Sequence, residues 1–208
     1  NNEIWSNSSG SADCISVNGG KLTMKITADE NKEKREPYIT TRNKFSQQYG
    51  CFTARMLMPK TTETSVSAFW LLPSNYNNNW GTSYLFEGTN LSCGEVDIIE
   101  YPSDWNGEAQ SALQWWDPTN ISGSHSATSQ KYKYDKLKNG EYIDVTGVWT
   151  ADAVYFYYDG ILQGSITNIS ATGEKACMIL SMSTWSGEFN PEAVDSLYCT
   201  VDYVKAYK

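Results

Sequence analysis

Three acidic side chains lie close together in one short apolar segment. Residues 94–100 read Gly-Glu-Val-Asp-Ile-Ile-Glu, so Glu95, Asp97 and Glu100 are interspersed with β-branched residues that favour a strand. Burying charges in such a strand costs free energy unless something compensates for it. Clustered carboxyl groups have a chemical use, because a retaining glycosidase places two of them roughly 5–5.5 Å apart, one as nucleophile and one as acid/base.

The spacing of the three acids sets a condition on the strand. Glu95 and Asp97 are two residues apart and share a face, whereas a regular strand sends Glu100 to the opposite face. A β-bulge near Ile98 and Ile99 restores the phase. Carboxylates gathered in this way raise the pKa of one another, which an acid catalyst needs. We therefore predict a bulged strand with all three acids in one groove; the alternative is an ordinary strand with one wet face.

The elements around this segment show the period-two alternation of β-strands. Asp159-Gly160 suits the type I′ turn of a hairpin. A short helical turn is expected at 190–197, and loops at 74–83 and 117–129. With no repeat or linker, we predict one domain over residues 1–208, an all-β antiparallel sandwich or jelly roll. The predicted strands are Lys21–Ile26, Phe52–Met58, Val154–Tyr158, Ile161–Ile166, Cys177–Trp185 and Leu197–Tyr207.

Composition excludes several classes of function. The net charge of −8 and the lack of a basic face argue against a nucleic-acid partner and favour a neutral substrate. No apolar run is long enough to span a bilayer. The five cysteines lack C-x-x-C spacing and His125 is the single histidine, which argues against a structural zinc site and against a serine or cysteine hydrolase. The chain begins in polar sequence as a processed chain does, and we expect a secreted monomer.

The acidic segment resembles the active-site signature E-[IV]-D-x-x-E of glycoside hydrolase family 16, in the bulged branch that includes laminarinases, agarases and carrageenases. Three flanking segments are similar to strands of that family and follow in the same order: residues 49–55 (YGCFTAR), 68–73 (AFWLLP) and 201–207 (VDYVKAY). The matches run from about Gly20 to Lys208. The resemblance implies a concanavalin A-like β-jelly roll whose concave face is a polysaccharide cleft.

The same resemblance implies roles for individual residues. Glu95 corresponds to the nucleophile, Glu100 to the acid/base and Asp97 to an assisting carboxyl. No cofactor is implied for the chemistry. Gln114 stands where bulged members often carry histidine, and Met182 and Ser183 replace two glycines before a conserved tryptophan. The resemblance also implies that Trp70, Arg55 and Trp185 line the cleft. It further implies that Asp202 binds a structural calcium ion on the convex face.

Alternation adds one more expectation from the residues themselves. Trp115 and Trp116 are neighbours, so in a strand one of them faces away from the core and toward the cleft.

Taken together, these features predict an endo-acting hydrolase of a neutral β-1,3- or mixed-linkage β-1,3-1,4-glucan. A galactan hydrolase of the agarase type and a non-catalytic carbohydrate-binding jelly roll are the alternatives, although the latter loses one or both glutamates that this chain keeps.

Overall fold

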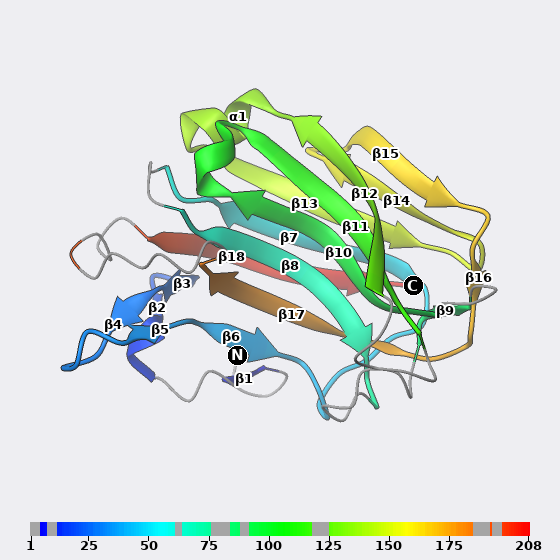
Figure 1. Cartoon of the computed structure of the whole chain (residues 1–208), viewed down its shortest axis with the longest axis horizontal. Helices are drawn as coiled ribbons and strands as arrows, with labels where there is room; N and C mark the ends of the chain where they lie inside the picture. The colour runs from blue at the N-terminus through cyan, green and yellow to red at the C-terminus, as the bar shows by residue number, and fades with distance from the viewer. Residues whose placement is uncertain are drawn as a thin grey trace.

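The computed structural model consists of two antiparallel sheets stacked face to face (Figure 1). It describes residues 5–7, 12–60, 64–75, 84–87, 92–117, 125–184, 192 and 197–208. The front sheet has the order β1-β6-β17-β8-β10-β11-β12, with β9 beside β10 and β16 beside β9. Its strands are β1 (Ser6–Asn7), β6 (Tyr38–Thr40), β8 (Val66–Pro73), β9 (Phe86–Glu87), β10 (Ser92–Pro102), β11 (Glu108–Trp116), β12 (His125–Lys133), β16 (Ser170–Ala171) and β17 (Ala176–Ser183).

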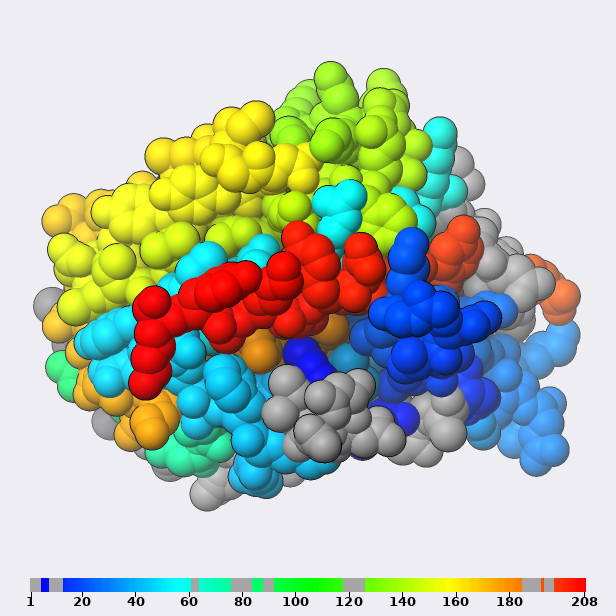
Figure 2. Space-filling view, turned by 180° about the vertical axis from the view of Figure 1, so that it is seen from behind, coloured from blue at the N-terminus to red at the C-terminus, as the bar shows by residue number. Residues whose placement is uncertain are grey.

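The back sheet has the order β15-β14-β13-β7-β18-β3-β2, and a small β4-β5 ribbon stands apart from both sheets. Figure 2 shows the back sheet from outside, with β18 in red crossing that face. The remaining strands are β2 (Ile15–Asn18), β3 (Lys21–Lys25), β4 (Thr27–Ala28), β5 (Lys34–Arg35), β7 (Gly50–Leu57), β13 (Tyr142–Trp149), β14 (Ala153–Tyr158), β15 (Ile161–Thr167) and β18 (Tyr198–Tyr207).

The hydrophobic core lies between the sheets and follows the alternation along each strand. In β7, Phe52, Ala54 and Met56 are fully buried in it. In β10, Val96, Ile98 and Ile99 belong to the same core. Because alternate side chains point to opposite faces, the residues between them lie on the outer faces of the sandwich.

Most expected elements are present, with two differences. Asp159 and Gly160 have φ of 47° and 76°, as a type I′ turn between β14 and β15 requires. Part of the loop expected at 117–129 is instead strand, because β12 begins at His125 and pairs with β11 along its whole length. The five-residue helix α1 (Asp135–Asn139) was not predicted. The helical turn expected at 190–197 lies almost wholly outside the described residues.

In the described part of the chain, no helix is long and apolar enough to cross a membrane. The described residues include 3₁₀ turns at Ala12–Cys14 and Ser103–Trp105. The second of these turns connects β10 to β11, the two strands that carry most of the candidate site.

Candidate active site

The acidic segment forms the middle of β10 and contains the predicted bulge. Against β11, the Cα register shifts between Asp97 and Glu100, and against β8 it shifts between Asp97 and Ile99. Ile98 and Ile99 are both buried in the core, so two successive side chains point inward. The extra residue restores the phase, and Glu95, Asp97 and Glu100 lie on the outer face of the front sheet.

Two contacts on the core side hold the bulge in place. The Ser111 hydroxyl of β11 donates a 2.7 Å hydrogen bond to the carbonyl oxygen of Ile98. Gly147 of β13 in the back sheet faces the Ile98 side chain so closely that a Cβ there would stand 2.8 Å from Ile98 Cγ1. The bulge therefore has a hydrogen-bonded backbone and a fitted space for its side chain.

Strand β11 supplies two amides to the acids. The Gln114 Nε2 donates to Asp97 Oδ2 at 2.9 Å, and the Gln110 Nε2 donates to Glu100 Oε2 at 2.7 Å. Ala112 lies between these glutamines and is paired with Asp97 in the register. An ionised carboxylate can only accept hydrogen bonds, so both amides favour the charged form of the acid they contact.

Burial dominates the electrostatics of the three acids. It raises the pKa of Glu95 to about 7, while a hydrogen bond from Asp97 counteracts the rise and the charge of Glu100 adds to it. Asp97 is only 1% exposed, and burial together with the charges of both glutamates holds its pKa well above its ordinary value. Burial also raises the pKa of Glu100, against the hydrogen bond from Gln110. The raised pKa favours the protonated form of Asp97, which can donate a hydrogen bond to Glu95.

The aromatic residues predicted for the cleft divide between the two faces. Trp70 of β8 is the Cα partner of Asp97, and its indole Nε1 donates to the Ser181 hydroxyl at 3.0 Å on the outer face. Trp115 packs against the core, so its neighbour Trp116 shares the outer face with Gln114. Trp185 lies outside the described residues.

Comparison with known families matches residues 4–205 to a family model described as glycosyl hydrolases family 16. The chain belongs to glycosyl hydrolase family 16. Comparison with curated proteins returns no significant match.

Solved structures of family 16 enzymes share the fold at low sequence identity. A laminarinase from Flavobacterium sp. UMI-01 has a TM-score of 0.79 at 21% identity, with coverage of 100% of this chain and 94% of the other. A Bacteroides ovatus enzyme of a mixed-linkage glucan locus has a TM-score of 0.77 at 16% identity, covering 100% and 96%. An endo-β-galactosidase from Clostridium perfringens has a TM-score of 0.75 at 20% identity, covering 100% and 59%. These likenesses establish the jelly-roll sandwich of family 16.

Arg55 was predicted to line the cleft, and that prediction is wrong. Arg55 belongs to β7 in the back sheet and points to that sheet's outer face, on the other side of the core from the three acids. There its guanidinium contacts Asp144 at 3.4 Å and Asp202 at 3.7 Å, and it lies over the Tyr142 ring. Alternation correctly placed Arg55 opposite the apolar face of its own strand. It could not show to which of the two sheets that strand belongs.

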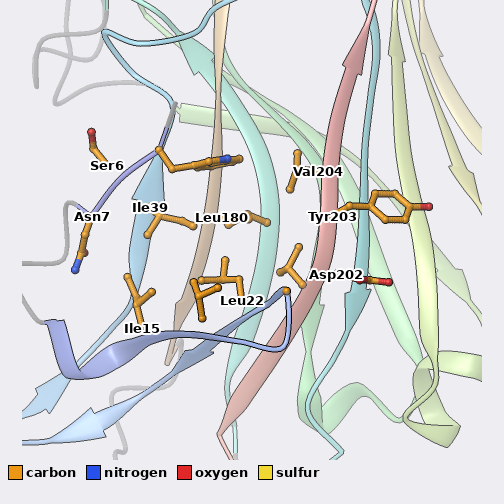
Figure 3. A pocket seen from close by; sticks show the side chains of 13 residues that line it. Ser6, Asn7, Ile15, Leu22, Ile39, Leu180, Asp202, Tyr203 and Val204 are labelled. Atoms are coloured by element: carbon orange, nitrogen blue, oxygen red, sulfur yellow. The ribbon is translucent and has the colours of Figure 1, made fainter. Parts of the chain in front are cut away.

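Asp202 was predicted to bind calcium, and its surroundings do not fit a cation. Its carboxylate is paired with Arg55. Figure 3 shows it pointing away from a pocket of about 410 Å³, into which Ile39, Leu180 and Leu22 project. Among the described residues, no group of three or more His, Cys, Asp or Glu side chains is placed to hold a metal ion. Calcium at Asp202 stays a prediction that these residues do not support.

Three contributors to the site were missed in the sequence: Gln110, Ser111 and Gly147. A signal for Gln110 was present, because Gln110 and Gln114 are four residues apart and therefore share one face of a strand. Ser111 and Gly147 carried no signal, because their importance depends on the bulge and on the distance between sheets.

Proposed function

We propose that this family 16 member is a retaining endo-β-glucanase of neutral β-1,3- or mixed-linkage β-1,3-1,4-glucan. The observation that carries the proposal is the bulge that gathers one buried and two half-buried acids, all of raised pKa, on one outer face. Perturbed acids in such a cluster are the groups that glycoside hydrolysis uses. The structural similarity to a laminarinase and to an enzyme of a mixed-linkage glucan locus supports the substrate class.

Each acid has a role in the proposed double displacement. The Glu95 carboxylate attacks the anomeric carbon while Glu100 protonates the departing glycosidic oxygen, which leaves a glycosyl ester on Glu95. Glu100, now a carboxylate, takes a proton from water, and that water displaces Glu95 with a second inversion. Asp97 donates its hydrogen bond to Glu95 and so offsets part of the rise that burial causes in the pKa of the nucleophile.

The outer face of the front sheet is the proposed sugar-binding surface. Trp70 and Trp116 offer aromatic faces on which the apolar C–H faces of sugars stack, and Gln114 offers an amide beside Asp97. Trp185 belongs to the same proposal by its resemblance alone. We also propose that the protein is secreted, because a polysaccharide is too large to cross a membrane unaided. We further propose that it is a monomer. A sedimentation profile and the distribution between culture medium and cells test these two proposals.

Product analysis on a panel of polysaccharides tests the substrate class. We expect laminarin or cereal β-glucan to be cleaved internally, with the first products in the β-anomeric form by NMR. Cleavage of agarose instead would support the alternative, a galactan hydrolase of the agarase type. First products in the α-anomeric form would contradict the retaining mechanism.

A further inference from the structure

Glu100 has one side-chain hydrogen bond whose consequence extends to the reaction itself. Gln110 is its direct partner in the β10–β11 register, beyond the bulge, and the amide contacts only Oε2. The contact is short, at 2.7 Å, and joins two half-buried side chains across neighbouring strands. Side chains directly opposite in an antiparallel pair are held at close range by the ladder itself.

We propose that Gln110 is a positioning residue for Glu100, holding Oε2 as an acceptor so that the acid proton resides on Oε1 and is presented to the glycosidic oxygen. The reason is the donor inventory. A neutral carboxyl has one hydroxyl and one carbonyl oxygen, and an N–H donor selects the carbonyl oxygen. The proposal rests on the proposed function in that Glu100 serves as acid/base.

The same contact acts on both halves of the reaction. In the first half Glu100 must hold a proton, and in the second half it must take one from water. Burial favours the neutral form, and the Gln110 amide favours the carboxylate. Gln110 therefore keeps the acid strong enough to donate and the conjugate base stable enough to form.

The charged groups around Glu100 do not replace this role. On its own strand, Glu95 and Asp97 are acids and oppose its ionisation. On β11 the charged residue of this face is Glu108. On β12 the charged residues are Lys133, the Cα partner of Glu108, and Lys131, the Cα partner of Gln110; the Lys131 ammonium lies 3.8 Å from the Glu108 carboxylate and over the Trp105 ring.

Strand β8 places uncharged residues, Ala68 and Trp70, on this face. Within the described residues, the hydrogen bond from the Gln110 amide is thus the side-chain contact that favours the Glu100 carboxylate.

Two substitutions at Gln110 with opposite electrostatic effects test the proposal. Gln110→Met keeps the length of the side chain and removes the donor, so the basic limb of the pH profile of kcat/KM should move to higher pH and kcat should fall about tenfold. Gln110→Lys supplies a cationic donor, so the same limb should move to lower pH. Gln163→Met, which removes an amide that contacts the Ile161 carbonyl on β15, is the matched control and should leave the limb unchanged.

A direct titration separates this inference from the proposed function. The Glu100 carboxyl resonance in protein labelled with ¹³C-glutamate is assigned by its loss in Glu100→Gln. Its midpoint should rise in Gln110→Met, or in Gln110→Ala if the Met variant does not fold, and fall in Gln110→Lys.

Midpoints that coincide with wild type would overturn the inference. A Gln110 variant with a higher KM and an unchanged basic limb of the pH profile would also overturn the inference, since that pattern indicates that Gln110 contacts the sugar. Shifted midpoints in a protein that hydrolyses none of the glucans would leave the positioning role standing and contradict the proposed function.

Discussion

At the scale of single residues, the two glutamates have roles that neither can perform for the other. Glu95→Gln removes the nucleophile and should abolish glucan hydrolysis, whereas Glu100→Gln should lower kcat by about 10²–10⁴-fold. The Glu100 variant should recover much of its rate on an aryl glycoside whose leaving group needs no proton. Initial rates on both substrates, with circular dichroism as the control for folding, check this prediction. Substantial activity in Glu95→Gln would show that the nucleophile is misassigned.

The adjacent tryptophans form a matched pair because they point to opposite faces. Trp115→Ala opens space beside the core and should lower the free energy of unfolding by about 3 kcal/mol. Trp116→Ala should leave stability nearly unchanged and raise the KM for oligosaccharides about tenfold, through the loss of a stacking surface. Urea unfolding and oligosaccharide kinetics on both variants distinguish the two effects. A Trp116 variant that mainly loses stability would place this residue in the core.

At the scale of elements, the bulge in β10 depends on the strand that lies across the core from it. Gly147→Ala on β13 places a Cβ at 2.8 Å from Ile98 Cγ1, which should cost about 1–3 kcal/mol of stability and shift the bulge that directs Glu100. The second substitution Ile98→Ala removes the clashing atoms. A double-mutant cycle in unfolding free energy and in kcat should therefore show coupling between the two sites. Additive effects would show that Gly147 does not support the bulge.

The elements also show where prediction from sequence succeeds and where it ends. The face shared by Glu95, Asp97 and Glu100 followed from phase alone, because a five-residue offset needs one extra residue. Trp70 lies on the same outer face as the acids, because β8 neighbours β10, and its contact with sugar stays a prediction. Arg55 was misplaced because its position in the cleft rested on the family resemblance, and alternation fixes only the two faces of a strand and not the sheet that the strand joins. Gly147 was invisible for a related reason: its role depends on the packing distance between sheets.

At the scale of the whole molecule, net charge restricts the substrates. The chain carries a charge of −8, and Glu95, Asp97 and Glu100 add local negative potential to the proposed site. Arg55 lies on the opposite side of the sandwich, so its guanidinium cannot neutralise that potential by contact. Polyanions should be repelled. We expect activity on laminarin or cereal β-glucan and little on carrageenan in parallel assays at ordinary ionic strength; the reverse preference would refute the charge argument but not the two-carboxylate mechanism.

The buried acids also make the stability of the whole fold depend on pH. Burial raises the pKa of Glu95 from 4.5 to about 7, so between these values the folded chain holds a proton that the unfolded chain releases. The free energy of unfolding therefore falls as pH rises through this window. A difference of this size corresponds to about 3 kcal/mol. The stabilisation is complete below pH 4.5 and is lost above pH 7.

Glu95→Gln resembles the protonated acid at every pH and should remove this part of the dependence. Its free energy of unfolding should match that of wild type near pH 4 and exceed it by about 3 kcal/mol near pH 8. Urea unfolding followed by tryptophan fluorescence at a series of pH values measures the difference. Glu192→Gln, at a side chain that is 80% exposed, controls for the change in net charge. Parallel curves for wild type and Glu95→Gln would show that the Glu95 carboxyl ionises as an ordinary glutamate, and the inference that burial raises its pKa would then be wrong.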